Sequence, residues 1–274
     1  MPDLSLLLLM AAVLATIGAI AGVLAGLLGV GGGIVLVPAF FYTFSALGYG
    51  SDQLMQICLA TSLATIVVTS VRSVLSHHKK GAVDWGILRV WAPGIAAGAL
   101  IGVIVASGLK SVVLQAIFGV LGLCIGVYMG LGRTHWRLAE DMPKGPRVAM
   151  IAPLIGFLSV LMGIGGGSFG VPLMTLHGRS IHKAVATAAG FGVLIAVPSV
   201  LGFMFVQIDP AGRPPWTIGA VNLPSFLLIV SMTLITAPLG VKLAHAMNPR
   251  PLKRVFAVFL TLVALSMLRK SLGW

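Results

Sequence analysis

The stretch that decides the fold is GVLAGLLGVGGGIVLVP at residues 22–38, which returns as GFLSVLMGIGGGSFGVP at residues 156–172. Each copy holds three consecutive glycines, with a proline five residues after the last of them, and neither copy contains a charged residue. The two copies are 134 positions apart, counting from 22 to 156. Because both the glycines and the proline recur at the same offsets, we interpret the chain as an internal duplication.

The composition around these segments is that of a membrane protein. Of 274 residues, 58% are hydrophobic and only 9% are charged, which excludes an ordinary soluble domain. Most charge-free runs reach the roughly 20 residues that a membrane-spanning helix needs. We therefore expect an all-α integral membrane protein. Spanning helices are expected at 54–76, 85–107, 112–132, 183–206, 223–246 and 252–271.

The duplication continues beyond the glycines. CLATSL at 58–63 is similar to AVATAA at 184–189, and GAVDW at 81–85 is matched by GAVNL at 219–223. Each half is thus expected to contain one glycine-broken helical element followed by three transmembrane helices. The expected units are a first repeat at 1–132, a polar linker at 133–147 and a second repeat at 148–274.

The net charge of +12 comes from 18 Lys and Arg residues in short connections between apolar runs. This distribution is typical of cytoplasmic loops and argues against a nucleic-acid partner. We place the linker 133–147 in the cytoplasm, and the loops holding Asp52, Lys110 and Asp209 outside. The basic clusters are 72–80, 133–147, 179–183 and 250–254.

Loop charge also indicates how the halves are oriented. The loop after the first glycine element is acidic and the next is basic, whereas the corresponding loops of the second half are basic and then nearly neutral. This alternation favours inverted repeats over parallel ones. Inversion requires an odd number of crossings in each half, so the glycine elements would be re-entrant. The first element could alternatively span, because the 25 residues from Leu4 to Leu28 that precede its glycines are long enough to cross alone.

The glycine segments are the predicted binding site. Non-helical backbone in a bilayer is tolerated only where protein or a water-filled cavity satisfies it. Helices that restart at Ile34 and Ser168 would point free N–H groups and positive dipole ends into such a cavity, which suits an anion. The alternative is that the glycines only let helices pack closely. The predicted segments comprise Gly31, Gly32, Gly33, Gly165, Gly166 and Gly167, with Pro38 and Pro172 as structural residues that distort the half-helices.

Nothing in the pattern favours an enzyme. The acidic residues and histidines fall in loops or helix ends, and no group recurs at metal-ligand spacing, so we expect no catalytic residue, metal or cofactor. Cys58 and Cys124 are interpreted as packing residues, with a thiol role for Cys58 as a remote alternative. Arg72 and Arg89 flank a positive loop and could draw anions to the cytoplasmic mouth.

GLLGVGGGIVLVP with LATS downstream, GAVDW, and the second GIGGGSFGVP resemble the TauE/SafE sulfite exporter family, also called the 4-toluene sulfonate uptake permease family. The resemblance covers nearly the whole chain. It implies a multi-pass transporter of the inner membrane whose partners are the lipid bilayer and a small sulfur-containing anion. Sulfite, sulfonates and thiosulfate all belong to that class. The alternatives are an anion channel and a transporter of another small organic anion.

The resemblance carries over to the Thr-Ser pair at Thr61 and Ser62, which becomes Thr187 and Ala188 in the second half. Thr61, Ser62, Thr187 and Ser168 are the best side-chain donors for a sulfur oxyanion, because a hydroxyl donates without bringing a buried charge. Their alternative role is to bond a carbonyl of their own helix. Transport is expected to proceed by alternating access between the two repeats.

Overall fold

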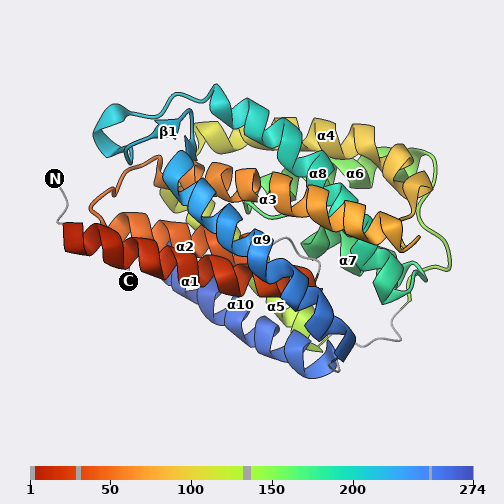
Figure 1. Cartoon of the computed structure of the whole chain (residues 1–274). Coiled ribbons are helices and arrows are strands. Elements are labelled where there is room, and N and C mark those ends of the chain that lie inside the picture. Colours follow the sequence, from red (N-terminus) through yellow and green to blue (C-terminus); the bar gives the residue numbers. More distant parts are fainter. Residues whose placement is uncertain (1–3, 29–31, 132–136, 247–248, 274) are drawn as a thin grey trace.

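The computed structural model describes residues 4–28, 32–131, 137–246 and 249–273. Within these ranges the chain is almost entirely helical, with one short hairpin (Figure 1). The helices are α1 (Leu4–Leu28), α2 (Gly33–Ala46), α3 (Leu54–Lys79), α4 (Trp85–Gly108), α5 (Ser111–Leu131), α6 (Pro146–Leu161), α7 (Gly167–Leu176), α8 (Ile181–Met204), α9 (Leu223–Ala246) and α10 (Pro249–Ser271). A 3-10 turn at Pro210–Gly212 precedes the hairpin strands β1 (Thr217–Ile218) and β2 (Val221–Asn222).

The expected all-α membrane fold is confirmed. All six expected helices are present, with ends within three residues of the prediction. In the described part of the chain, six helices are long and apolar enough to cross a membrane. Five of them are α3, α4, α5, α8 and α9, and the sixth is Leu8–Gly26 within α1. The first glycine element therefore begins with a helix of spanning length, while the second begins with the shorter α6. The helix expected to span at 252–271 is present as α10, but it is not among these six.

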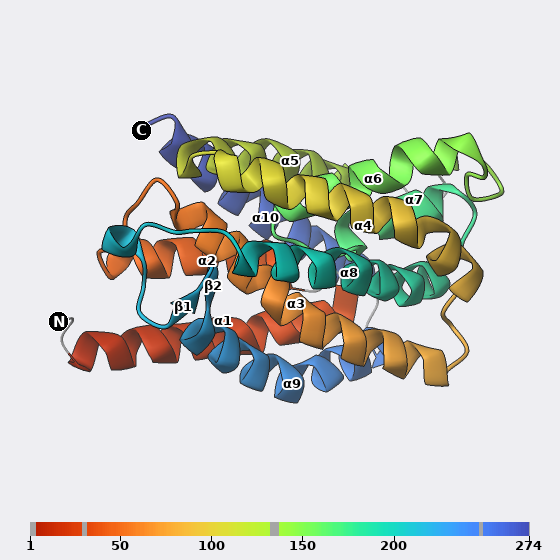
Figure 2. The same ribbon diagram turned by 90° about the horizontal axis from the view of Figure 1, so that it is seen from above.

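Of the candidate membrane spans, α3 and α8 are the most buried, and they pack against each other at the centre (Figures 1 and 2). Around them α1 packs on α9, α4 on α6, and α5 on α10. By the sequence repeat, α1 to α5 correspond to α6 to α10. The contact of α1 with α9 therefore has its counterpart in the contact of α6 with α4. The remaining contacts, α3 with α8 and α5 with α10, each join a helix to its own counterpart.

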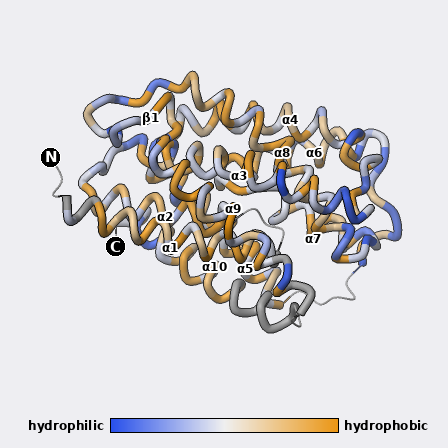
Figure 3. The backbone as a smooth tube through the Cα atoms, viewed as in Figure 1, coloured by the Kyte–Doolittle hydropathy of each residue, from blue (hydrophilic) through white to orange (hydrophobic). Residues whose placement is uncertain are grey.

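Corresponding helices run in opposite directions. In Figure 1, α3 runs from left to right, whereas α8 runs from right to left. Figure 2 shows the same relation between α5 and α10. The end of α10, near the C-terminus, lies beside the start of α5. Figure 3 shows hydrophilic residues gathered in the connections at the two ends of the helices.

The loops that were expected on the outer side lie together at one end. Lys110 Nζ is 3.4 Å from Asp52 Oδ2, and the backbone N–H of Asp209 donates to Gln53 Oε1 over 2.8 Å. The basic loops lie at the other end, where Leu138 N–H donates to Leu176 O over 2.8 Å. The grouping of loops thus follows the charge pattern.

Close backbone approach explains many of the glycines. A Cβ added to Gly98 in α4 would lie 1.9 Å from the carbonyl oxygen of Pro153 in α6, and one added to Gly156 would lie 2.1 Å from that of Ile95. Only glycine lets these two helices touch along their backbones, as small residues do in membrane helix packing.

The hairpin was not expected from the sequence. Thr217 pairs with Asn222 and Ile218 with Val221, in antiparallel register around Gly219. Gly219 has φ +56°, a left-handed conformation that favours glycine. The hairpin places Asn222 directly before α9, where it contacts α3.

Candidate functional site

The glycine breaks are present where the sequence predicts them. Gly32 lies directly before α2 and has φ +74°. This left-handed conformation favours glycine over other residues. In the second half, Gly163 has φ +61° and the chain passes Gly165 and Gly166 before α7 begins at Gly167. Gly31, which also belongs to the predicted site, lies outside the described residues.

The two breaks touch each other. A Cβ added to Gly33 would lie 2.5 Å from the carbonyl oxygen of Gly163 and 3.0 Å from Ile164 Cα. Ser62 on α3 donates its hydroxyl to the same Gly163 oxygen over 2.7 Å. The structure therefore joins Gly33 and Ser62 at Gly163, a residue that was not among the predicted site residues.

The second break also packs on α8. A Cβ added to Gly166 would lie 2.3 Å from Phe191 Cβ and 2.7 Å from the oxygen of Ala188. Ser168, which directly follows the break, is only 4% exposed, and its Oγ has no hydrogen-bond partner among the described residues. A buried hydroxyl without a partner is unusual and is a natural donor for a ligand.

Both half-helices begin with backbone N–H groups that donate to no described carbonyl. Gly33 and Ile34 in α2, and Gly167 and Ser168 in α7, donate no backbone hydrogen bond to a described carbonyl, as expected in a first helical turn. Ile34 is completely buried. Pro38 and Pro172 lie inside α2 and α7, and both helices continue through them. These amides and the positive helix ends can bind an anion.

The two predicted threonines connect the halves. Thr187 Oγ1 accepts a hydrogen bond from the backbone N–H of Asp84, and Thr61 Oγ1 accepts one from that of Asn222, each over 3.0 Å. In these two bonds and in the Ser62 bond, the partner lies outside the helix that carries the hydroxyl. Among the described residues, none of the hydroxyls of Thr61, Ser62 and Thr187 bonds a carbonyl of its own helix.

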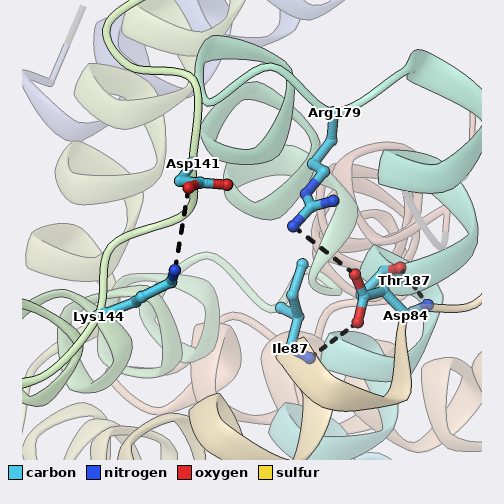
Figure 4. A network of polar contacts seen from close by, with 6 residues as sticks. All are labelled: Asp84, Ile87, Asp141, Lys144, Arg179 and Thr187. Carbon is cyan, nitrogen blue, oxygen red and sulfur yellow. Dashed lines mark hydrogen bonds and ion pairs between the residues drawn. The ribbon is translucent and has the colours of Figure 1, made fainter.

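The partners of these threonines are matched helix caps. Asp84 Oδ1 accepts the N–H of Ile87, and Asn222 Oδ1 accepts that of Ser225, each over 3.1 Å. Asp84 Oδ2 also lies 4.0 Å from Arg179 Nη2 (Figure 4). Sequence reasoning missed both caps, although their place in GAVDW and GAVNL was the signal.

The two cysteines differ. Cys58 is fully buried in α3, which agrees with a packing role, whereas Cys124 is exposed on α5, so the packing interpretation is wrong for Cys124. Cys124 lies on the outer surface of the helix bundle because α5 packs on α10 through its glycines instead, with Gly119 and Gly122 facing Ala264.

Comparison with known proteins assigns the family. The sequence profile of the sulfite exporter TauE/SafE family matches residues 14–267. A probable membrane transporter protein of Haemophilus influenzae is 32% identical over 254 residues, covering 93% of this chain and 96% of that protein. Probable membrane transporter proteins of Methanocaldococcus jannaschii and Bacillus subtilis are 24% and 26% identical, and each alignment covers 95% of this chain, with 96% and 98% of the relative. No solved structure matches the chain.

The profile match spans both halves of the chain, both glycine breaks and both threonine contacts, and the three relatives align over almost their whole length. The chain therefore belongs to the TauE/SafE sulfite exporter family and is a multi-pass membrane transporter.

Proposed function

We propose that the chain carries a small sulfur-containing anion, such as sulfite, a sulfonate or thiosulfate, across the inner membrane and binds it between the two glycine breaks. The family description supports this class of substrate. The observation that carries the site is Ser168, a buried hydroxyl without a partner in the first turn of α7. It stands beside backbone N–H groups that donate to no described carbonyl.

The chemistry of this site suits an anion that must also leave. Its donors are hydroxyls and backbone amides, reinforced by the positive ends of α2 and α7. None of the predicted site residues carries a charge, so a bound oxyanion would be stabilised without a permanent ion pair. Weak neutral donors favour turnover over tight retention.

Alternating access would arise from movement of one half against the other. The opposite courses of corresponding helices and the matched packing of α1 on α9 and α4 on α6 support inverted repeats. In the structure Gly33 contacts Gly163, so the two breaks are closed on each other. Rocking of the repeats would part them and expose the first turns of α2 and α7.

The membrane potential is sufficient to drive export. A potential that is negative inside pushes an anion outward with about 2.3 kcal/mol per charge for each 100 mV. A dianion would gain about 4.6 kcal/mol by the same rule. Passive facilitated export therefore needs no coupling ion. The basic loops would face the cytoplasm, with the linker 133–147 among them.

The test is uptake of labelled sulfite into proteoliposomes under an imposed potential, with sulfate, taurine and acetate as competitors. Saturable flux that follows the potential and is blocked by sulfur anions is the expected result. Flux that rises linearly with concentration would instead identify an anion channel, and inhibition by acetate alone would identify a carrier of other organic anions.

The site itself is tested by Ser168→Ala, which should lower the flux about tenfold or more if the hydroxyl donates to the anion, by analogy with loss of a charge-assisted hydrogen bond. Ser199→Ala is the matched control. Ser199 is equally buried, but its Oγ bonds Ile195 O of its own helix over 2.6 Å. Equal flux in the two variants would remove Ser168 from the site.

A further inference from the structure

A cavity of about 370 Å³ opens at the end of the molecule that carries the basic loops. It lies where α1, α3, α8 and α9 come together, and Figure 2 shows α3 and α9 side by side there. Arg72 and Lys80 contribute from α3 and the loop after it, and Lys242 contributes from α9. The sequence had singled out Arg72 and Arg89, and of these two only Arg72 is among the described lining residues.

The charge of this cavity is uncompensated. Among the described residues, its lining contains three fixed cations and no aspartate or glutamate. In the described part of the chain, the ion pairs are made by other residues, namely Asp52 with Lys110, Asp84 with Arg179 and Asp141 with Lys144. A concave surface lined by one sign of charge raises the local concentration of counter-ions.

The helix dipole explains only part of this charge. Lys80 follows the last residue of α3, where the negative helix end favours a cation without any ligand. Arg72 lies two turns earlier, beyond the reach of that effect. Lys242 comes from a different helix, α9. The convergence of Arg72 and Lys242 on one cavity therefore needs a separate reason.

Two hydroxyls in the lining are available as donors. Ser76 Oγ donates to Arg72 O and Thr69 Oγ1 to Thr65 O, which are ordinary bonds within α3. Ser70 and Ser73 also line the cavity, yet neither hydroxyl bonds a described residue. Ser70 is only 4% exposed. Cations together with free hydroxyls are the donor set that an oxyanion uses.

The inner end of the cavity reaches the second glycine break. Ser70 Oγ lies 2.4 Å from the position that a Cβ on Gly192 would occupy. The backbone nitrogen of Gly192 in turn lies 2.8 Å from the position of a Cβ on Gly166. One layer of backbone thus separates the cavity floor from the break.

We propose that this cavity is a second anion site, a vestibule in which Arg72, Lys80 and Lys242 hold a small oxyanion and Ser70 and Ser73 donate hydrogen bonds to it before it passes to the glycine breaks. The passage to the breaks rests on the proposed function. Capture of an oxyanion in the vestibule is a property of the cavity alone, so the two can be tested separately.

The test uses a chain in which Cys58 and Cys124 are alanine and Ser73→Cys supplies a single reporter thiol. The purified protein is reacted with an anionic methanethiosulfonate, the sulfonatoethyl reagent, and with the cationic trimethylammonium-ethyl reagent. Each rate is divided by the rate of the same reagent with a free small thiol. We expect the anionic reagent to be favoured about tenfold, as for a focused positive cleft. Sulfate and ethanesulfonate should protect the thiol.

The preference should fall several-fold in Arg72→Gln and in Lys242→Gln, and should persist in the control Lys183→Gln. Lys183 is an exposed cation on α8 that is not among the described lining residues of the cavity. Ser76→Cys provides a second reporter in the same cavity if Ser73→Cys does not fold. Equal normalised rates, or a preference that Arg72→Gln and Lys242→Gln leave unchanged, would overturn the vestibule.

Sulfite flux in proteoliposomes separates the two proposals. If the labelling preference is present without sulfite flux, the vestibule stands and the proposed function fails. If flux is present while the labelling preference is absent, the proposed function stands and the vestibule is wrong.

Discussion

Thr187 Oγ1 accepts a hydrogen bond from the backbone N–H of Asp84, which belongs to the other half of the chain. The same relation recurs between Thr61 and Asn222. Each threonine holds the capping residue at the fourth position of GAVDW or GAVNL, so each half fixes the start of a helix in the other. The two bonds are therefore matched contacts between the repeats.

Replacing either threonine by valine should destabilise the protein. Valine keeps the shape but leaves a backbone N–H without its partner, with an expected loss of about 1–3 kcal/mol in the free energy of unfolding. Thr187→Ser and Thr61→Ser keep the acceptor and should lose less than half of that. Thermal unfolding of the purified protein in detergent measures the difference. A Thr187→Val protein as stable as Thr187→Ser would show that the bond contributes nothing.

The long helices could be predicted because their signal is local. A membrane-spanning helix needs a continuous apolar run of fixed length, and α3, α4 and α9 each have one. The grouping of Asp52, Lys110 and Asp209 at one end could be predicted as well, because the charge of each loop is read from the sequence of that loop alone.

The partners of the site residues could not be predicted in this way. Thr61 and Asn222 are 161 positions apart, and the bond depends on how α3 meets the hairpin before α9. The hairpin itself has strands of two residues, too short for a sequence pattern. The cations Arg72 and Lys242 lie on different helices and are brought together only by the packing of α3 on α9.

Gly166→Leu should abolish transport while the protein still inserts. The first added atom would lie 2.3 Å from Phe191 Cβ and 2.7 Å from Ala188 O, so the α7 start must move away from α8. Gly130→Leu is the control, because its nearest neighbour would be Ala257 Cβ at 3.7 Å. The measurements are sulfite flux in proteoliposomes and the amount of protein in the membrane fraction. Unaltered flux in Gly166→Leu would contradict a functional role for the break.

Inverted repeats predict that Asp52 and Ser180 lie on opposite sides of the membrane. Each residue is exposed and directly follows a half-helix element, α2 or α7, before α3 or α8 begins. Asp52→Cys and Ser180→Cys, in a chain without other cysteines, should react with an impermeant maleimide from opposite sides of sealed vesicles. The first should label from the periplasmic face and the second only in inside-out vesicles. Labelling of both from one side would make the repeats parallel.

Exchanging the acidic and amide caps should have unequal effects, because the two environments differ. Asp84 is half-exposed beside Arg179, so Asp84→Asn keeps the cap oxygen and loses only a surface ion pair of about 1 kcal/mol or less. Asn222 is 3% exposed, and its amide donates to Pro215 O and Thr217 Oγ1, each over 3.0 Å.

Asn222→Asp removes both of those donations and puts a carboxylate against the Pro215 carbonyl oxygen, and no cation among the described residues forms a hydrogen bond or ion pair with Asn222 to offset the charge. We expect a loss of about 3 kcal/mol or more. Because the folded protein would disfavour the charged form of the new carboxyl, part of the loss should be recovered as the pH falls and that group is protonated. Unfolding midpoints of both variants at neutral and acidic pH provide the measurement. Equal destabilisation by the two exchanges would mean that the caps are equivalent, and that burial of Asn222 does not distinguish the halves.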